Sequence, residues 1–222
     1  MQTRLEITSD GSHTLFVREL NEHYHSTFGA VQESMHVFIQ SGFDEIDKTI
    51  VPVNILEMGF GTGLNALLTL INSEKNSRQV HYTGVEKFPL SDGIIEQLNY
   101  PQILNPSFVK IFRSLHNSGW NQEIKITADF TLFKINKDLQ DLIFNPDTFD
   151  LVYYDAFGPE VQPELWTDQI FQKITNAMKP GGILVTYSVK GSVRRTLKST
   201  GFEVKKLPGP PGKREITRAT KK

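Results

Sequence analysis

Three glycines at alternate positions form the stretch best suited to chemistry. They are Gly59, Gly61 and Gly63, and they separate the apolar runs NILEM and LNALL. A strand, a glycine turn and a helix in this order gather backbone N–H groups and a helix N-terminus around one point. Glycine there permits positive φ and lets a ligand approach the backbone. The pattern predicts a nucleoside or phosphate site, and a tight turn that binds nothing is the alternative.

The spacing of this turn narrows the choice of ligand. A dinucleotide fingerprint needs glycine where the chain has Leu64, and a P-loop needs a lysine that GTGLNA lacks. With Glu57 two residues earlier, the spacing E-x-G-x-G-x-G resembles the first motif of class I S-adenosylmethionine-dependent methyltransferases. In that superfamily an acid at the end of the next strand binds the ribose hydroxyls, and Glu86 ends YTGVE. A carboxylate can accept from both hydroxyls. These features favour the methyl donor over NAD.

A second acidic strand end occurs in YYDAFGPEVQPELW. Asp155 follows an apolar strand and precedes Phe157. Ligands of open α/β sheets bind at the carboxyl ends of strands near the switch in strand order, so Asp155 is expected beside the glycine turn. In amine-methylating members of the superfamily, an acid or amide here holds the nucleophilic nitrogen. Asp155 as a helix N-cap is the alternative, although Pro163 with Glu164 is the more natural helix start.

The chain around these residues alternates between apolar runs and helical patterns. The pattern predicts an α/β domain of the class I methyltransferase (Rossmann-like) type, with a mostly parallel sheet and helices on both faces. Strands are expected within 51–58, 80–88, 150–157 and 180–188, and helices within 64–72, 91–99, 163–179 and 191–201. Residues 123–135 are expected to form a β-hairpin insertion that turns at Ala128-Asp129, and 202–219 two short strands. Residues 99–120, rich in Pro, Asn and Ser, are expected to form loops or an insertion.

Two segments flank this core pattern. Residues 1–50 are expected to be an N-terminal extension packed on a methyltransferase domain at 51–222, with strands near LEIT and HTLFV and a helix near ESMHVFIQSGF. Residues 189–222 contain eleven Lys and Arg against two Glu, while the whole chain of 222 residues has a net charge of −1. This basic segment either faces a polyanion or is ordinary solvated surface.

Composition excludes several classes of protein. A hydrophobic content of 38% and a charged content of 22% are typical of soluble globular proteins. The first residues lack the apolar core of a signal peptide, and no stretch is apolar enough to span a membrane. The chain has no cysteine, which excludes disulfides, thiolate metal sites and a thiol nucleophile. With no signal peptide, no membrane span and no cysteine, a cytoplasmic location is the default expectation. The six histidines are scattered without metal spacing, so we expect no metal site.

Several longer strings resemble the methyltransferase domain of the MnmC family. They are LEMGFGTGLNALL, YTGVEKFPL, YYDAFGPEVQPELWT, KPGGILVTYSVKGSVRRTLKSTGFEV and GPPGKREITRA. The resemblance extends from about Leu15 to Ala219. It implies S-adenosylmethionine-dependent methylation of 5-aminomethyl(-2-thio)uridine at the wobble position of tRNA. Bifunctional members add an FAD-dependent domain, and no FAD is expected in a chain that ends at Lys222.

The resemblance assigns roles to particular residues. Asp155 is the catalytic residue that holds the nitrogen. The expected cofactor-binding residues are Glu57, Gly59, Phe60, Gly61, Gly63, Glu86, Lys87, Asp138 and Asp155. Asp138 takes the position that faces adenine, although Lys137 replaces the family's glycine before it, and Asp129 competes for this role. The expected substrate-binding residues are Tyr24, His25, Phe157, Trp166, Arg194, Arg195, Lys213 and Arg214. In this set the aromatic residues, together with Phe60, are candidates to stack an extruded base, and the basic ones are candidates to meet phosphates.

Other functions compete with this interpretation. A methyltransferase of a small-molecule amine would use the same cofactor and would act without tRNA. A non-catalytic binding protein could retain the fold, but the intact Glu86, Asp155 and glycine turn disfavour it. An NAD-dependent oxidoreductase is disfavoured by Leu64.

Overall fold

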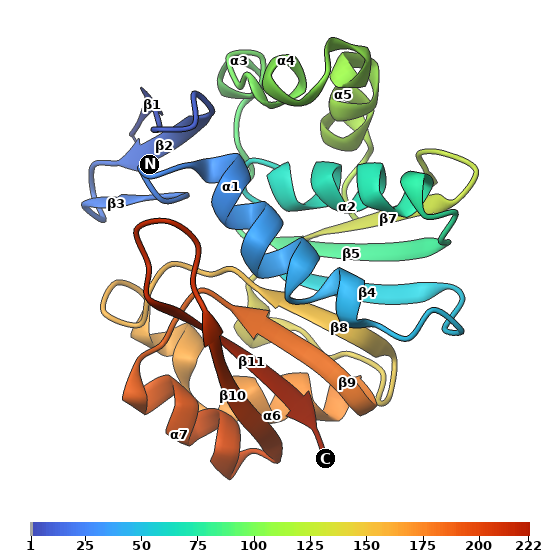
Figure 1. Cartoon of the computed structure of the whole chain (residues 1–222), viewed down its shortest axis with the longest axis vertical. Helices are drawn as coiled ribbons and strands as arrows, with labels where there is room; N and C mark the ends of the chain where they lie inside the picture. The colour runs from blue at the N-terminus through green and yellow to red at the C-terminus, as the bar shows by residue number, and fades with distance from the viewer. Residues whose placement is uncertain (1) are drawn as a thin grey trace.

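An eight-stranded sheet forms the centre of the protein, whose computed structural model describes residues 2–222. The strand order is β10-β11-β9-β8-β4-β5-β7-β6 (Figure 1). The strands from β9 to β7 in this order are parallel, and β6, β10 and β11 are antiparallel to their neighbours. Their bounds are β4 Val53–Met58, β5 Val80–Glu86, β6 Glu123–Lys125, β7 Phe130–Asn136, β8 Phe149–Tyr154, β9 Met178–Thr186, β10 Phe202–Pro208 and β11 Glu215–Lys221. The expected mostly parallel sheet is confirmed.

The strand order reverses between β4 and β8. From β4 the chain proceeds to β5 and then β7, and it returns to the other side of β4 as β8. The two strands pair in parallel, so Met58 lies opposite Tyr154 and both strands end at the same edge of the sheet. Such a switch point leaves a crevice beyond the carboxyl ends of the strands, which is where open α/β sheets bind ligands.

Helices cover both faces of the sheet, above and below it in Figure 1. One apolar core includes Ile55 of β4 and side chains from α1, the adjoining π-helix, α2 and α5. The other includes Leu56 and Met58 and side chains from α6 and α7. Successive residues of a strand point to opposite faces, so one strand supplies both cores. The helix bounds are α1 Ala30–Ser34, the π-helix Met35–Gln40, α2 Leu64–Lys75, α3 Asp92–Ile95, α4 Tyr100–Leu104, α5 Val109–Asn117, α6 Asp168–Ala177 and α7 Gly191–Ser199.

The N-terminal segment forms a small sheet of its own. β1 (Thr3–Ile7), β2 (His13–Val17) and β3 (Glu22–His23) are antiparallel, so the two expected strands are confirmed. The expected helix begins at Ala30, before the pattern that indicated it. Leu15 and Phe38 share an apolar core with the central sheet, which fixes this segment beside the carboxyl ends of the strands.

The structure corrects three expectations about local elements. Residues 99–120 are mainly helical, because Phe108, Ile111, Phe112 and Leu115 recur at helical spacing and pack on the core beside α2. The hairpin β6–β7 is not a separate insertion, since β7 is the core strand next to β5. Pro163 begins only a short 3₁₀ turn.

The α-helix that follows this turn is α6. It is capped by Thr167, whose Oγ1 accepts from the Ile170 N–H at 3.4 Å.

Within residues 2–222, no helix is both long and apolar enough to cross a bilayer.

Gly84, in the middle of β5, gives a test of how the sheet supports the glycine loop. A Cβ at this position would lie 2.6 Å from the Phe60 ring, and Phe60 is buried inside that loop. We expect Gly84→Ala to displace the ring and lower the free energy of unfolding by about 1–3 kcal/mol. Gly93→Ala, in α3 with no atom within 4 Å of its added Cβ, is the matched control and should be neutral or stabilising. Equal urea midpoints for both variants would contradict this packing.

Candidate active site

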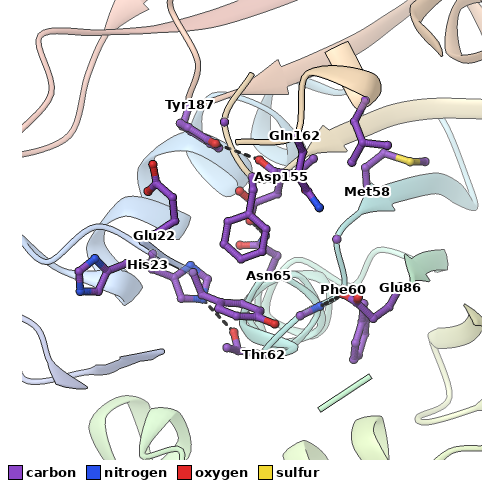
Figure 2. A pocket seen from close by; sticks show the side chains of 18 of the residues that line it. Glu22, His23, Met58, Phe60, Thr62, Asn65, Glu86, Asp155, Gln162 and Tyr187 are labelled. Atoms are coloured by element: carbon purple, nitrogen blue, oxygen red, sulfur yellow. Dashed lines mark hydrogen bonds between the residues drawn. The ribbon is translucent and has the colours of Figure 1, made fainter. Parts of the chain in front are cut away.

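A cavity of about 500 Å³ lies beyond the carboxyl ends of β4, β5 and β8 (Figure 2). Its walls come from segments that are far apart in the chain. They are residues 22–28 with Glu33, 58–62 with Leu64 and Asn65, 85–88, 137–140, 155–158, Gln162, Glu164, Leu165, Tyr187, and Gly212 with Lys213. Gly63, expected to contact the cofactor, is not among the lining residues. In Figure 2, Asp155 and Asn65 lie between Glu86 on one side and Tyr187 on the other. The cavity therefore occupies the switch point of the sheet.

The glycine loop approaches its neighbours too closely for side chains. All three glycines have positive φ, at 90° for Gly59, 48° for Gly61 and 71° for Gly63. A Cβ on Gly59 would lie 2.7 Å from the Asp155 carbonyl oxygen, and one on Gly63 would lie 2.8 Å from His116 Nε2. Glycine is thus required for both conformation and space. The loop brings bare backbone to the floor of the cavity, beside the end of β8.

Glu86 is held at the end of β5 by backbone donors. Its Oε2 accepts from the Gly61 N–H at 3.0 Å, and its Oε1 accepts from the Phe88 N–H at 2.8 Å. Burial raises the pKa of this carboxyl above its ordinary value, and the two hydrogen bonds oppose that rise. The carboxylate is therefore fixed in direction, and its remaining acceptor capacity faces the cavity that it lines.

Asp155 and Glu57 are joined through one amide. Asn65 Nδ2 donates to Asp155 Oδ2 at 2.8 Å and to Glu57 Oε1 at 2.9 Å. Asp155 lines the cavity, whereas Glu57 is fully buried and does not. The structure therefore corrects the expected direct cofactor contact of Glu57, which supports Asn65 from behind. Asp155 does not cap a helix, since its carboxylate is taken up by Asn65 at the cavity wall.

Burial raises the pKa of both linked carboxyls. The pKa of Asp155 rises to about 7, and the Asn65 hydrogen bond partly opposes this rise. The pKa of Glu57 lies well above its ordinary value because of burial and then because of Asp155 nearby. Two acids this close do not both ionise readily. Asp155 is consequently a carboxyl that can exchange a proton near neutrality.

The adenine-facing candidates, Asp138 and Asp129, lie at opposite ends of β7. Asp138 follows β7 and lines the cavity, where its Oδ2 accepts from Lys87 Nζ at 2.7 Å and its Oδ1 from the Gln140 N–H at 2.9 Å. Burial acts against these bonds, but together they lower the pKa of Asp138. Asp129 precedes β7 and is not among the lining residues, so only Asp138 remains a candidate for the adenine.

Two aromatic side chains stand at the cavity wall. The rings of Tyr24 and Phe157 meet edge to face, with centroids 5.2 Å apart, and both line the cavity. Trp166 does not line the cavity. It is 6% exposed, and its Nε1 donates to the Phe157 carbonyl at 2.8 Å. This placement contradicts the expected stacking role of Trp166, which instead fixes the backbone beneath Phe157. Phe60 lines the cavity but is buried in the core.

His25 is a buried wall residue. Its Nε2 lies 2.8 Å from the Thr62 hydroxyl, and burial lowers the pKa of the imidazole to about 4. The ring is neutral near pH 7, so it orders the glycine loop rather than attracting an anion. Within residues 2–222, no three His, Asp or Glu side chains are grouped to hold a metal ion.

The basic segment is partly neutralised by the fold. Six of its eleven cations form ion pairs, and the other five form none with residues 2–222. Lys213 lines the cavity, where its Nζ lies 2.5 Å from Glu33 Oε1 and 4.2 Å from the centre of the Tyr187 ring. Arg194 and Arg195 lie on α7 and Arg214 on the loop before β11, and none of them lines the cavity. Their contact with phosphates stays a prediction.

Sequence reasoning misses four residues that shape the site. They are Asn65, Thr62, Glu33 and Tyr187. Asn65 had a signal in its position, because it lies in the first turn of the helix that follows the glycines. Glu33 and Tyr187 had none, since their partners Lys213 and Ala156 are distant in the chain.

Residues 102–222 match the family model described as S-adenosyl-L-methionine-dependent methyltransferase. The chain belongs to this methyltransferase family. The matched region contains β7, β8 and Asp155 and all elements to the C-terminus. The expected class I methyltransferase fold is confirmed.

Curated relatives of this methyltransferase are bifunctional proteins. The tRNA 5-methylaminomethyl-2-thiouridine biosynthesis bifunctional protein MnmC of Cupriavidus metallidurans is 29% identical over 95% of this chain and 33% of its own length. The protein of the same name from Cupriavidus necator is 30% identical over 89% of this chain and 31% of its own length. The chain thus spans about a third of the length of these relatives.

Solved structures support the same relationship. MnmC2 from Aquifex aeolicus superimposes with a TM-score of 0.82 and 27% identity, covering 100% of this chain and 70% of that one. Spermidine synthase from Thermotoga maritima, at a TM-score of 0.54 and 11% identity over 100% of this chain and 72% of that one, shares the fold alone. The resemblance to the methyltransferase part of MnmC is confirmed.

The Asn65 bridge gives a pH-dependent test of the site. Both linked carboxyls have folded-state pKa values above those of the unfolded chain, so folding becomes less favourable as pH rises above their ordinary pKa values, and for Asp155 this cost reaches its full size near pH 7, where the folded carboxyl also ionises. Asn65 reduces this cost by donating to both. We expect Asn65→Ala to lower the free energy of unfolding by about 1–3 kcal/mol at pH 8 and by less at pH 5.

Urea unfolding at the two pH values measures this effect. Asn76→Ala is the control, because Asn76 lies at the end of the same helix and its exposed amide donates only to the Asn72 carbonyl. An equal loss for Asn65→Ala at both pH values would show that the amide does not stabilise ionised carboxyls.

Proposed function

We propose that this methyltransferase converts 5-aminomethyl(-2-thio)uridine at the wobble position of tRNA into 5-methylaminomethyl(-2-thio)uridine. The observation that carries the proposal is Asp155, a carboxylate presented to the cavity beside the glycine loop. The named pathway of the MnmC relatives supplies the acceptor, and their methyltransferase part is the part that this chain matches. The proposal requires one half of the cavity for the methyl donor and the other for the base.

The donor half fits S-adenosylmethionine. Gly59 and Gly61, which line the cavity, leave the loop backbone there free of side chains, which suits the close approach of an amino-acid moiety. Glu86 offers fixed carboxylate oxygens for two ribose hydroxyls, and Asp138 lies further along the same wall for the adenine amine. The donor supplies a methyl group bonded to a positively charged sulfur.

Asp155 is suited to hold the amine nitrogen. The aminomethyl group is largely protonated near neutrality, and only its neutral form has a lone pair that can attack. Asp155 accepts a hydrogen bond from the nitrogen and, with a pKa raised to about 7, can take up its proton. Asn65 fixes the direction of the carboxylate, so the nitrogen is aligned before transfer.

The acceptor half suits a base taken out of its stack. Tyr24 and Phe157 contact each other edge to face, and both present aromatic surface to the cavity. Lys213, Glu33 and Tyr187 add polar groups on the same side of the cavity. Extruded bases are commonly held by aromatic stacking and hydrogen bonds to the base edge. A small-molecule amine is the second candidate acceptor, and it would need none of the basic surface.

A pair of variants separates binding of the donor from alignment of the acceptor. We expect Glu86→Gln to weaken S-adenosylmethionine binding roughly 10- to 100-fold through the loss of charge-assisted hydrogen bonds. We expect Asp155→Ala to retain donor affinity and to lose methylation of tRNA from cells that lack the activity. Calorimetry measures the first effect, and nucleoside analysis after reaction with labelled donor measures the second. Wild-type turnover by Asp155→Ala would overturn the role of this carboxylate.

The basic helix α7 allows a test of tRNA as the partner. Lys190, just before α7, pairs with Glu160, which lies between the cavity-lining Gly158 and Gln162. Arg194 and Arg195 therefore lie within two helical turns of that pair. We expect binding of tRNA to weaken steeply with salt, and each arginine-to-alanine change to reduce the slope of log K against log salt by about one.

The control is Lys75→Ala, which removes the same charge at the far end of α2. It should leave the slope unchanged. Wild-type binding that is flat from low to high salt, with methylation of a free amine, would favour the small-molecule acceptor.

A further inference from the structure

Phe28 stands exposed at the mouth of the cavity. It is 55% exposed and lines the cavity together with the acceptor-side residues Tyr24 and Lys213. Phe88, the other large exposed apolar residue at the cavity, lies beside Glu86 on the donor side. A single exposed phenylalanine is ordinary in a soluble protein. The position of Phe28 needs an explanation only because of what surrounds it.

The loop before β11 fixes the Phe28 ring. A Cβ added at Gly212 would clash with this ring, so the ring packs directly against the glycine. Gly212 has a φ of 85°, which favours glycine for a second reason. The loop is itself closed by hydrogen bonds from the Lys213 N–H to Pro210 O at 2.9 Å and from the Gly209 N–H to Arg214 O at 3.1 Å. The ring thus packs against backbone while more than half of the surface of Phe28 stays open to solvent.

Two cations, Lys213 and Arg214, directly follow Gly212 in the same loop. Lys213 is paired with Glu33, whose buried carboxylate it neutralises. Arg214 is exposed and forms no ion pair with residues 2–222. An open aromatic ring and an uncompensated cation on one loop are the combination with which proteins bind single-stranded nucleic acid, where bases stack on rings and cations follow the backbone.

We propose that Phe28 stacks the nucleotide adjacent to the base that enters the cavity, and that Arg214, in the loop on which the ring packs, follows the backbone of that strand. This inference rests on the proposed function. Extruding a base removes the stacking partner of its neighbour in the strand. A preordered ring at the cavity mouth replaces that partner at little cost in conformational entropy. The predicted occupant is therefore a single-stranded anticodon loop rather than a free nucleoside or a protein.

The test uses the full chain and an anticodon stem-loop RNA carrying 5-aminomethyluridine at the wobble position. We expect Phe28→Ala to weaken binding of this RNA roughly 5- to 100-fold, the range found for one base on one ring. Phe28→Trp should restore binding, and Phe28→Leu should not, because leucine retains apolar bulk without an aromatic face. The KM for RNA should rise, while kcat and the affinity for S-adenosylmethionine stay as in the wild type.

A fluorescent base gives the readout specific to stacking. With 2-aminopurine next to the wobble position, the wild type should quench its emission on binding, and Phe28→Ala should not at saturating protein. The control variant is Ile143→Ala, because Ile143 is 95% exposed and does not line the cavity. Its affinity and quenching should equal those of the wild type.

The outcomes separate this inference from the proposed function. If the wild type methylates the stem-loop and Phe28→Ala binds it like Ile143→Ala, the inference fails alone. Weakened binding with unchanged quenching also overturns it, because the ring then acts by something other than stacking. If the wild type methylates a free amine but not the RNA, the proposed function fails and the inference fails with it.

Discussion

The close approach of two strand ends governs the architecture of this methyltransferase. β4 and β8 finish side by side, and the backbone after β4 passes against the Asp155 carbonyl with no space for a Cβ on Gly59. The Asp155 N–H donates to Met58 O at 3.1 Å, which ties the two loops together. Because of this contact the glycine loop and the Asp155 carboxylate are neighbours. The strand order determines where the crevice lies, and the helices and the N-terminal segment pack around it.

Burial of several acids in such a crevice makes it costly for them to ionise. Glu86, Asp155 and Glu57 are each held by N–H donors, which partly oppose the effect of burial on their pKa values. Among residues 2–222, no cation is a hydrogen-bond partner of any of the three. Donors without formal charge leave these carboxylates able to respond to a charged or proton-bearing ligand. The site is therefore ordered in shape while its protonation remains adjustable near neutrality.

One wall of the cavity is built from segments at both ends of the chain. Tyr24 and Phe28 come from the N-terminal segment, and Lys213 comes from the loop between the last two strands. The Lys213–Glu33 pair and the packing of Phe28 on Gly212 join the two segments across the cavity mouth. Because of these contacts, Gly212 and Lys213 of the basic segment are part of the cavity wall. Charge counted along the sequence therefore overstates the basic surface that is free for a polyanion.

The sequence by itself determined the features that are local to strand ends. Glycines at alternate positions, Glu86 at the end of β5 and Asp155 at the end of β8 were all visible, because a turn needs positive φ and a strand end follows an apolar run. Trp166 and Glu57 were misassigned, since their sequence neighbours could not show that they point away from the cavity. The helix α5 was missed under a loop-like composition. Asn65 as a bridge, Glu33 opposite Lys213 and Phe28 on Gly212 were decided only by the tertiary structure, because each contact joins residues that the chain separates and only packing brings together.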